Sequence, residues 1–588
     1  IKVEWEEKGV LGEADPKIAI RKMSASELAK RRAALFEAWP GMQAAWLDEL
    51  CEQEGMQAFL NAGQNYPLLR GVQTNLYKCF LPQAWMIGSP TGVSAFVHPE
   101  GVYDDPKGGA FREAIYPRLK LHCQYQNEFA LFVGTNDHGR MRFGTHVYKN
   151  RAGEAVSFLS INNLFTPRTV DACFDHDGGG AVPGIKQEGD GGRSRWNTQG
   201  HRDRLIPVRE PELALFAQLY DEAGTPPLQA RLPALHARQL ISVLEKFAAQ
   251  PRRLGDLKGE YFSTVMFDET YAQRDGTIRR ETRFPDHAGQ WVLSGPHFFV
   301  GTPFYKTPRT VCTANSHYDC LDLTQIPDDY LPRTNYVPAC SPAEYAERTP
   351  QVPWSSGPKR SATSDSPDPS GPSDGSAPSG SHAPAWEQAP TLQRRESDAG
   401  RRSGQDVVPT QSVGTRGEVT RQLITCHFRL ISRTMLSQSG ERTLIASIIP
   451  PGPAHIDLGF SLTLKDFRGV ALLCALFSSI TLDFFVKSTG KGHFRNDIAS
   501  LLPFPKATPE RTGLFSRSVA LSSLTKQYTD LWQSCYQPDF RNQRWSVAPD
   551  DPNSPPWSAC LRADKDFFAN LTPAWQRNCA LRTDYSRR

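Results

Sequence analysis

The sequence lacks the paired cysteines that would indicate a zinc ribbon or a disulfide scaffold. It has 12 cysteines in 588 residues but no Cys-x-x-Cys pair, and the tightest group is Cys312, Cys320 and Cys340. That spacing does not fit a zinc site. So low a density in so long a chain does not fit a disulfide-stapled secreted domain either. We therefore expect reduced thiols, no metal and a cytoplasmic location.

The short signatures of common enzyme classes are also missing. There is no Walker phosphate loop, no Gly-x-Gly-x-x-Gly after a strand, no His-Glu-x-x-His and no Gly-x-Ser-x-Gly. The run GGGAVPG at 178–184 has no strand–helix context, which favours a loop. No pair of carboxylates stands out from the acidic background. The residues alone therefore assign no reaction.

A strong charge imbalance is absent too. The formal net charge is +4, with 39% hydrophobic and 22% charged residues, which is typical of a globular protein. A nucleic-acid partner must therefore be argued from local basic clusters. The length predicts several domains.

One long hydrophobic run is present, GVALLCALFSSITLDFFV at 469–486. Its length is near the minimum for a membrane span, but it contains Asp483 and several hydroxyl side chains. A buried core helix followed by a polar loop is the better interpretation.

The pattern along the chain predicts an α/β organisation. Residues 24–60 have a helical apolar stripe, and helix is expected again over 209–250. Between them, short apolar runs such as GVSAFVHPEG, NEFALFVGTND and FGTHVYKN indicate buried strands.

The composition changes sharply after residue 354. Residues 355–384 have almost no apolar side chains, and we expect disorder to continue to about Gln411. Order is expected from about 418 to 506, followed by a helical tail in which VALSSLTKQYTDLW is the strongest segment.

A run of segments in fixed order resembles a known enzyme family. They are YPLLRGVQTNLYKCFLPQAWMI, GVSAFVHPEGVYDDPKGGAFREAIYPRL, NEFALF and MRFGTHVYKN. Together they resemble the second half of the catalytic domain of gamma-class adenine-specific DNA methyltransferases. The similar proteins belong to restriction–modification and phage-defence systems of the type IIG, BREX and DISARM kinds. The matching positions are Gly71, Asn75, Leu76, Tyr77 and Phe80, then Gly92, Ala95 and Pro99, then Phe111 and Arg112.

The resemblance implies a methyl donor and a place for this chain in the complete enzyme. The donor is S-adenosylmethionine. The opening IKVEWEE resembles the segment that follows the family's catalytic Asn-Pro-Pro-aromatic tetrapeptide. The cofactor glycine motif and the catalytic residues are therefore expected upstream of Ile1. No catalytic residue is expected in this chain. The chain alone is then expected to be inactive and to need an upstream methyltransferase half or other defence-system subunits.

The same resemblance suggests residues around the target base. Phe143, and next Tyr148, are candidates to stack on it, while Asn75, Tyr77 and Phe80 are expected near the cofactor. Core packing is the alternative for the aromatic side chains.

A second resemblance covers about 290–345 and 418–506, which are similar to the family's target-recognition domain. The matching pattern consists of Arg429, Ile431, Thr434, Arg442, Thr443, Ala446, Ile448 and Pro450. Lys487, Lys491, His493 and Arg495 follow in a glycine-containing loop where they could reach DNA. Capping of a helix C-terminus is the alternative.

A further basic loop, residues 187–205, contains Arg193 and Arg195 near Trp196. Phosphate contact is one interpretation, and a solvated surface loop is the other.

These observations predict an α/β protein that is the C-terminal half of a Rossmann-like methyltransferase domain, a target-recognition domain and a helical tail, with a disordered insert. The expected boundaries are 1–206 for the methyltransferase part, 207–350 for a helical connector with the first part of the recognition domain, 351–415 for the linker, 416–506 for its second part, and 507–588 for the tail. The expected partner is double-stranded DNA, with no membrane. The expected function is N6-adenine methylation as part of a complete enzyme; the alternative is a non-catalytic specificity module.

Overall fold

The computed structural model describes residues 7–21, 23, 25–72, 75–132, 142–189, 194–297, 302–314, 316–323, 326–355, 419–437, 442–505, 512–538 and 540. The chain divides into two units, one of Ile1–Val352 with Leu423–Arg588 and one of Pro353–Gln422. The second unit contains most of the paired strands β14 (Gln351–Ser355) and β15 (Val419–Leu423). The predicted linker lies almost wholly outside the described residues.

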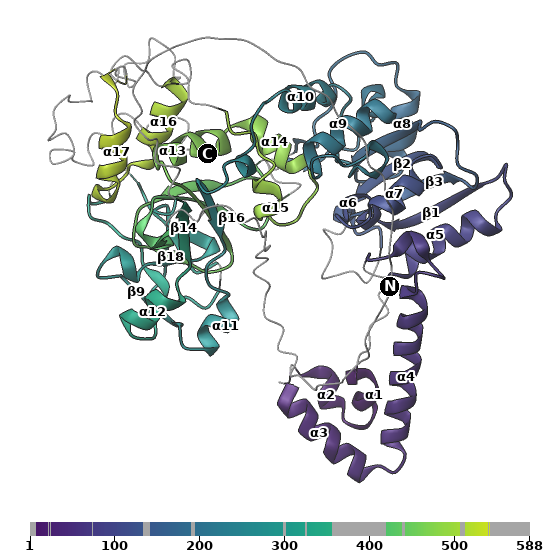
Figure 1. Cartoon of the computed structure of the whole chain (residues 1–588), viewed down its shortest axis with the longest axis horizontal. Helices are drawn as coiled ribbons and strands as arrows, with labels where there is room; N and C mark the ends of the chain where they lie inside the picture. The colour runs from purple at the N-terminus through teal and green to yellow at the C-terminus, as the bar shows by residue number, and fades with distance from the viewer. Residues whose placement is uncertain are drawn as a thin grey trace, which may run out of the picture. The chain divides into compact units, whose positions relative to one another are not determined.

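Four helices open the first unit (Figure 1). They are α1 (Glu7–Ala14), α2 (Pro16–Ile20), α3 (Ala25–Ala38) and α4 (Met42–Asn61). The Asp15 carboxylate caps α2 by accepting from the Lys17 amide and pairs with Arg31 of α3 at 2.7 Å. The predicted helices over 24–60 are confirmed.

A five-stranded mixed sheet follows. Its order is β1 (Val93–Pro99), β3 (Arg142–Lys149), β2 (Leu119–Gln126), β4 (Phe158–Leu164) and β7 (Ile206–Val208). The β2–β4 pair is parallel, and the other three pairs are antiparallel. The mixed α/β class is confirmed. The Rossmann-like assignment stays a prediction.

Helices pack beside this sheet (Figure 1). They are α5 (Leu76–Ile87), α6 (Gly101–Asp104), α7 (Gly109–Ile115) and α8 (Arg168–Asp175). On one face Cys123, Tyr125 and Ile161 pack with Cys173 of α8. On the other face Tyr148 packs with Trp85 of α5 and Phe111 of α7. Because side chains alternate along a strand, the second face also receives the even-numbered polar residues of β2 and β3.

The strand predictions had two outcomes here. GVSAFVHPEG and FGTHVYKN form β1 and β3, as predicted. NEFALFVGTND was predicted to be a strand, which is wrong for its described part. Asn127–Phe129 form a 3₁₀ turn, and Ala130 follows in the left-handed conformation with φ 49°. That conformation turns the chain away from the sheet.

Short elements connect this sheet to the rest of the unit. The strands β5 (Lys186–Glu188) and β6 (Ser194–Trp196) form a hairpin, and α9 (Glu210–Tyr220) and α10 (Leu240–Ala248) come next. The predicted helix over 209–250 is therefore interrupted, with residues 221–239 outside both helices.

A second sheet is antiparallel, with order β17 (Ala446–Ile449), β16 (Arg429–Arg433), β19 (Gly459–Leu464) and β8 (Tyr261–Thr264). Its strand β8 precedes the insert, and the other three follow it. Strand β8 lies in the region 207–350, which was predicted to contain a helical connector and the first part of the recognition domain. That region and the region 416–506 therefore share a sheet, although their role in recognition stays a prediction.

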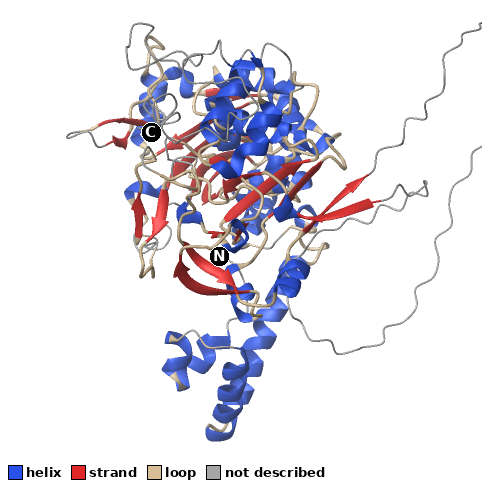
Figure 2. Cartoon of the chain, turned by 90° about the vertical axis from the view of Figure 1, so that its left-hand side faces the viewer, coloured by secondary structure: helices blue, strands red, loops and turns tan. Residues whose placement is uncertain are grey.

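Smaller elements surround the second sheet. Three two-stranded pairs are β9 (Ile278–Arg283) with β13 (Thr334–Pro338), β10 (Val292–Leu293) with β18 (Ala454–His455), and β11 (Lys306–Pro308) with β12 (Tyr318–Cys320). The helices are α11 (Glu269–Arg274), α12 (Pro342–Arg348), α15 (Asn496–Ala499), α16 (Thr512–Ser522) and α17 (Thr529–Cys535). The last two belong to the predicted tail, and residues beyond 540 lie outside the described part. Figure 2 distinguishes these helices and strands by colour.

The hydrophobic run at 469–486 forms two helices instead of the one predicted. They are α13 (Arg468–Phe477) and α14 (Ile480–Ser488), which meet at 72°. Most of their side chains are buried in the core, as predicted. Within the described part of the chain, no single helix has the length and apolar character to cross a membrane, and this bent pair meets those limits only in combination.

Arg442 and Asp483 hold the bend. Arg442 donates to the carbonyl oxygens of Phe477 and Ser478, which have no partner inside the ending helix. The Asp483 carboxylate accepts from the amides of Thr443 and Leu444 at 2.8 and 2.7 Å. Arg442 and Thr443, which belong to the predicted recognition pattern, therefore make contacts that hold the two helices together.

Arg429 belongs to the same pattern and is fully buried in β16. It donates to the carbonyl oxygen of Pro453, and burial lowers its pKa to about 9. Its side chain is therefore part of the core.

We expect Asp483→Ala to lower the free energy of unfolding by about 3 kcal/mol, because two buried amides lose their acceptor and Arg442 loses its buried partner. The measurement is urea denaturation followed by circular dichroism. Asp319→Ala is the control, since Asp319 pairs with Arg309 at an exposed site, and should change it by less than about 1 kcal/mol. Equal small effects would contradict the structural role of Asp483.

Candidate functional site

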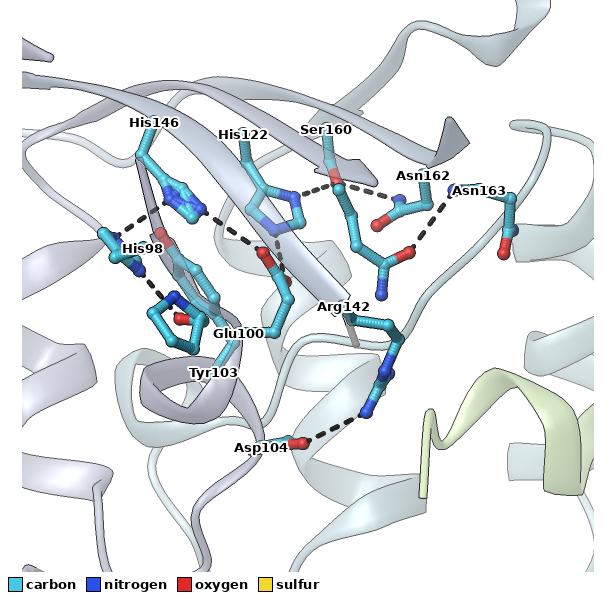
Figure 3. A network of polar contacts seen from close by, with 12 residues as sticks. His98, Glu100, Tyr103, Asp104, His122, Arg142, His146, Ser160, Asn162 and Asn163 are labelled. Atoms are coloured by element: carbon cyan, nitrogen blue, oxygen red, sulfur yellow. Dashed lines mark hydrogen bonds and ion pairs between the residues drawn. The ribbon is translucent and has the colours of Figure 1, made fainter. Parts of the chain in front are cut away.

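Three histidines meet on the face of the five-stranded sheet that packs against α5 and α7 (Figure 3). His122 of β2 is paired directly with His146 of β3. His98 of β1 is paired with Gly144, two residues before His146, and therefore lies diagonally from it. Ser160 of β4 lies opposite His122. The register of four strands thus gathers polar side chains inside the protein.

Glu100 follows β1 and completes the group. Its Oε2 lies 2.9 Å from Nε2 of His122, and its Oε1 lies 3.3 Å from Nε2 of His146. The exposed fractions of Glu100, His122 and His146 are 7%, 1% and 1%. Their three ligand-type atoms all lie within 4.8 Å of one another. We call Glu100, His122 and His146 the two-histidine cluster.

His98 fixes the hydrogen positions of its neighbour. Its Nδ1 lies 2.8 Å from the carbonyl oxygen of Pro99, which only accepts, so Nδ1 carries the hydrogen. Burial lowers the pKa of His98 to about 4 and that of His146 well below its ordinary value, so both rings are neutral at pH 7. Nδ1 of His146 therefore donates to Nε2 of His98, 3.0 Å away. The remaining lone pair of His146, on Nε2, faces Glu100.

Hydroxyl and amide groups support the same face. Nδ1 of His122 contacts Oγ of Ser160 at 2.9 Å, and the Asn162 amide donates to that oxygen at 3.0 Å. The hydroxyl of Tyr148 contacts Nε2 of His98 and the hydroxyl of Tyr103, each at 2.9 Å. These contacts hold the imidazole rings in one orientation.

An open cleft of about 830 Å³ lies beside this face. Its lining residues are Asn61, Leu69, Gly71, Val72, Asn75, Tyr77, Lys78, Pro99, Gly101, Asp104, Asp105, Pro106, Lys107 and Lys491. The Tyr77 ring stacks on His98, with ring centres 5.2 Å apart and planes 18° apart. One wall of the cleft is therefore in direct contact with the histidines.

The cleft contains charges of both signs. Lys78 pairs with Asp105 at 3.1 Å, and Asp104 lies 3.6 Å from Arg142. Burial raises the pKa of Asp104. Lys491 lies 3.5 Å from Asp497. Such a lining suits a polar ligand that has hydrogen-bond donors and acceptors.

The structure brings together two of the three residues predicted near the cofactor. Asn75 is the N-cap residue of α5, and both Asn75 and Tyr77 line the cleft. Phe80 is 56% exposed and is not among the lining residues.

The two candidates for base stacking lie on opposite faces of β3, because they are separated by an odd number of residues. Phe143 stacks on Tyr125, with ring centres 5.2 Å apart and planes 8° apart. Tyr148 is fully buried on the histidine side. The structure does not bring them together, and their stacking role stays a prediction.

The residues predicted to contact DNA have different surroundings, and their role stays a prediction. Lys491 lines the cleft, whereas Lys487 is on α14 and burial lowers its pKa. His493 is exposed, and its backbone forms an isolated antiparallel β-bridge with Met435. Arg495 is the N-cap residue of α15.

The second predicted basic loop is described only in part. Arg195 is exposed on β6, opposite Gln187. Arg193 lies outside the described residues.

The two-histidine cluster was missed at the level of sequence. Its members are 22 and 24 residues apart in the chain, too far for a local metal motif. HPE and THVY each contain one histidine within a segment that was predicted to be a strand, whereas no strand was predicted over LHCQ, which contains His122. The register that aligns these positions is not visible in one sequence.

Comparison with known proteins gives little to add to this geometry. No protein-family model matches the chain, and no curated protein matches it either. Among solved structures, the type IIG restriction endonuclease BpuSI is similar, with 10% identity and a TM-score of 0.22 over 88% of this chain and 50% of that one. The chain thus spans half the length of that enzyme. A TM-score this low carries no argument about fold or function.

We expect the hydroxyl groups of Tyr103 and Tyr148 to be energetically coupled. Each single Tyr→Phe change should cost about 1–2 kcal/mol of unfolding free energy, because it removes the buried hydrogen bond between the two hydroxyl groups. The double variant should cost less than the sum by about 1 kcal/mol. Chemical denaturation of all variants measures this. As a control, Tyr528→Phe removes an unrelated buried hydrogen bond to Ile448 and should be additive with Tyr103→Phe. Additivity of the Tyr103 and Tyr148 changes would contradict the network.

Proposed function

We propose that this chain is part of a site-specific DNA methyltransferase that transfers a methyl group from S-adenosylmethionine to N6 of adenine. The cleft is where the target base is held. The supporting observation is that Asn75 and Tyr77 share the cleft with Lys491. These residues were predicted from sequence for two different tasks, contact with the cofactor or base and contact with DNA. Asn75 and Tyr77 precede the insert in the sequence, whereas Lys491 follows it.

The chemistry of adenine fits this lining. A base swung out of the duplex offers an aromatic face and an amino group with two hydrogens. Tyr77 supplies an aromatic surface held in place by His98. The side-chain oxygen of Asn75 and the Asp104 and Asp105 carboxylates supply acceptors for the amino hydrogens. In this proposal the chain holds the base, and S-adenosylmethionine is the methyl donor of the complete enzyme.

Contact with the DNA backbone falls to the cations of the cleft. Lys491 and Lys107 lie in two separate chain segments that line the same cleft. Flexible ammonium groups suit phosphates, which position the duplex without reading its sequence. The second sheet and its neighbouring loops then carry sequence recognition.

The base-holding role can be tested without methyl transfer. Duplexes selected from a random library define a preferred sequence, and each adenine in it is then mispaired in turn. Because a mispair lowers the cost of extrusion, binding should tighten about 10-fold at one adenine. Tyr77→Ala should remove most of that gain, since stacking on the base is lost. Tyr271→Ala, at an exposed tyrosine outside the cleft, should keep it. Sequence-specific binding with no gain at any adenine would instead favour a specificity module.

The contact of Lys491 with phosphate has its own signature. In Lys491→Ala the slope of log affinity against log salt should become shallower by about one unit, because one counterion-releasing contact is lost. Lys465→Ala is the matched control, since Lys465 is exposed and does not line the cleft. The measurement is fluorescence anisotropy of a labelled duplex at several salt concentrations. An unchanged slope in a folded variant would remove Lys491 from the DNA interface.

A further inference from the structure

The two-histidine cluster contains two buried acceptor atoms that face each other. Oε1 of Glu100 and Nε2 of His146 lie 3.3 Å apart, and neither has a hydrogen-bond partner among the described residues. Nδ1 of His146 contacts Nε2 of His98 at 3.0 Å, so Nε2 is the nitrogen of His146 that is directed at Glu100. A cation between Nε2 of His146 and Oε1 of Glu100 would give both atoms a partner and compensate a buried negative charge.

The spacing of the three atoms fits coordination of one ion. Nε2 of His122 lies 2.9 Å from Oε2 of Glu100, and all three ligand atoms are within 4.8 Å of one another. In a tetrahedral zinc site with bonds of about 2.0–2.1 Å, ligand atoms lie roughly 3.3 Å apart. The separations of 2.9 and 3.3 Å between the histidine nitrogens and the Glu100 oxygens are close to that value.

The surroundings have the features that support metal ligands. The second nitrogen of each histidine is occupied, on His122 by Ser160 and on His146 by His98. Such contacts orient the rings and direct Nε2 of each at Glu100. Nε2 of His146 has no hydrogen-bond partner among the described residues, and the hydrogen bond of His122 to Oε2 of Glu100 would be replaced by a bond to the ion. A cavity of about 10 Å³ adjoins Glu100 and His122, with Gln124 and Asn162 in its lining. It has room for about one water molecule as a further ligand.

Gly144 keeps the space between the ligands open. A Cβ added there would collide with Nε2 of His146 and with Oε1 of Glu100. Gly144 does not have a positive φ, so the backbone alone does not require glycine. The requirement comes from the volume beside these two atoms.

We propose that Glu100, His122 and His146 bind one divalent transition-metal ion, with Zn²⁺ as the expected species. Two imidazoles and a carboxylate are a ligand set that zinc accepts in proteins, and the absence of sulfur disfavours the softer metals. The ion joins β2, β3 and the end of β1 behind the cleft wall formed by Tyr77. This inference does not rest on the proposed function.

The first test uses the full chain without substitution. After purification and loading with Zn²⁺, elemental analysis should give about one ion per chain that survives gel filtration against a weak chelator. Loading with Co²⁺ instead should give visible d–d absorption without the near-ultraviolet band of a cobalt–thiolate bond, because the ligands are nitrogen and oxygen. A loaded chain without d–d absorption would overturn the proposal, as would a thiolate band accounting for all bound cobalt.

The second test assigns the ion to the cluster. His122→Ala removes a ligand, and Gly144→Ala fills the space between the ligand atoms without changing a ligand residue. Both should lower affinity for Zn²⁺ by at least about 100-fold in competition with a chromophoric chelator. His455→Gln is the control, because His455 is also fully buried but lies in β18, bonded to Ser461. Its affinity should equal that of the unsubstituted chain. Unchanged binding in folded His122→Ala and Gly144→Ala would overturn the assignment. If either variant fails to fold, the cobalt spectrum of the unsubstituted chain remains the test of the ligand types.

Discussion

The buried carboxylate of Glu100 constrains the part of the protein that surrounds it. It lies between two imidazoles, and one of its oxygens faces the lone pair of His146. A charge removed from water in this way needs compensation. Several features determine the small volume around Glu100. They are the strand register, Gly144, and the contacts of the two histidines with His98 and Ser160. The site is therefore built by the sheet as a whole.

The same strand end that carries this cluster also forms a wall of the cleft. His98 and Glu100 point inward, while Pro99, Gly101 and Asp104 line the cleft. The Tyr77 ring stacks on the His98 ring, so the fixed position of His98 also restrains Tyr77 at the cleft surface. An ion bound as we propose would fix His146 and, through His98, restrict the position of the Tyr77 ring that we propose contacts the target base. The C-terminal segment adds Lys491 to the same cleft.

Sequence reasoning reached the local elements but not the contacts between them. The strand β1 was predictable because its apolar run begins after Gly92 and ends at Pro99, and β3 because it is a short run rich in aromatic and β-branched residues. The 3₁₀ turn at Asn127–Phe129 was not, since its composition is that of a strand and the left-handed Ala130 leaves no local signal. The opposite orientations of Phe143 and Tyr148 follow from parity alone and were available in advance. The bend between α13 and α14 depends on Arg442 and Asp483, which are distant partners. Likewise, the two-histidine cluster exists only once three strands are aligned.

Anomalous diffraction from crystals of the zinc-loaded chain, collected on both sides of the zinc absorption edge, tests the central claim most directly. The account predicts one edge-specific peak about 2 Å from Nε2 of His122, Nε2 of His146 and a carboxylate oxygen of Glu100. It would be contradicted by a map with no peak there and with Glu100 and His146 joined by an ordinary hydrogen bond, since a proton would then supply the compensation.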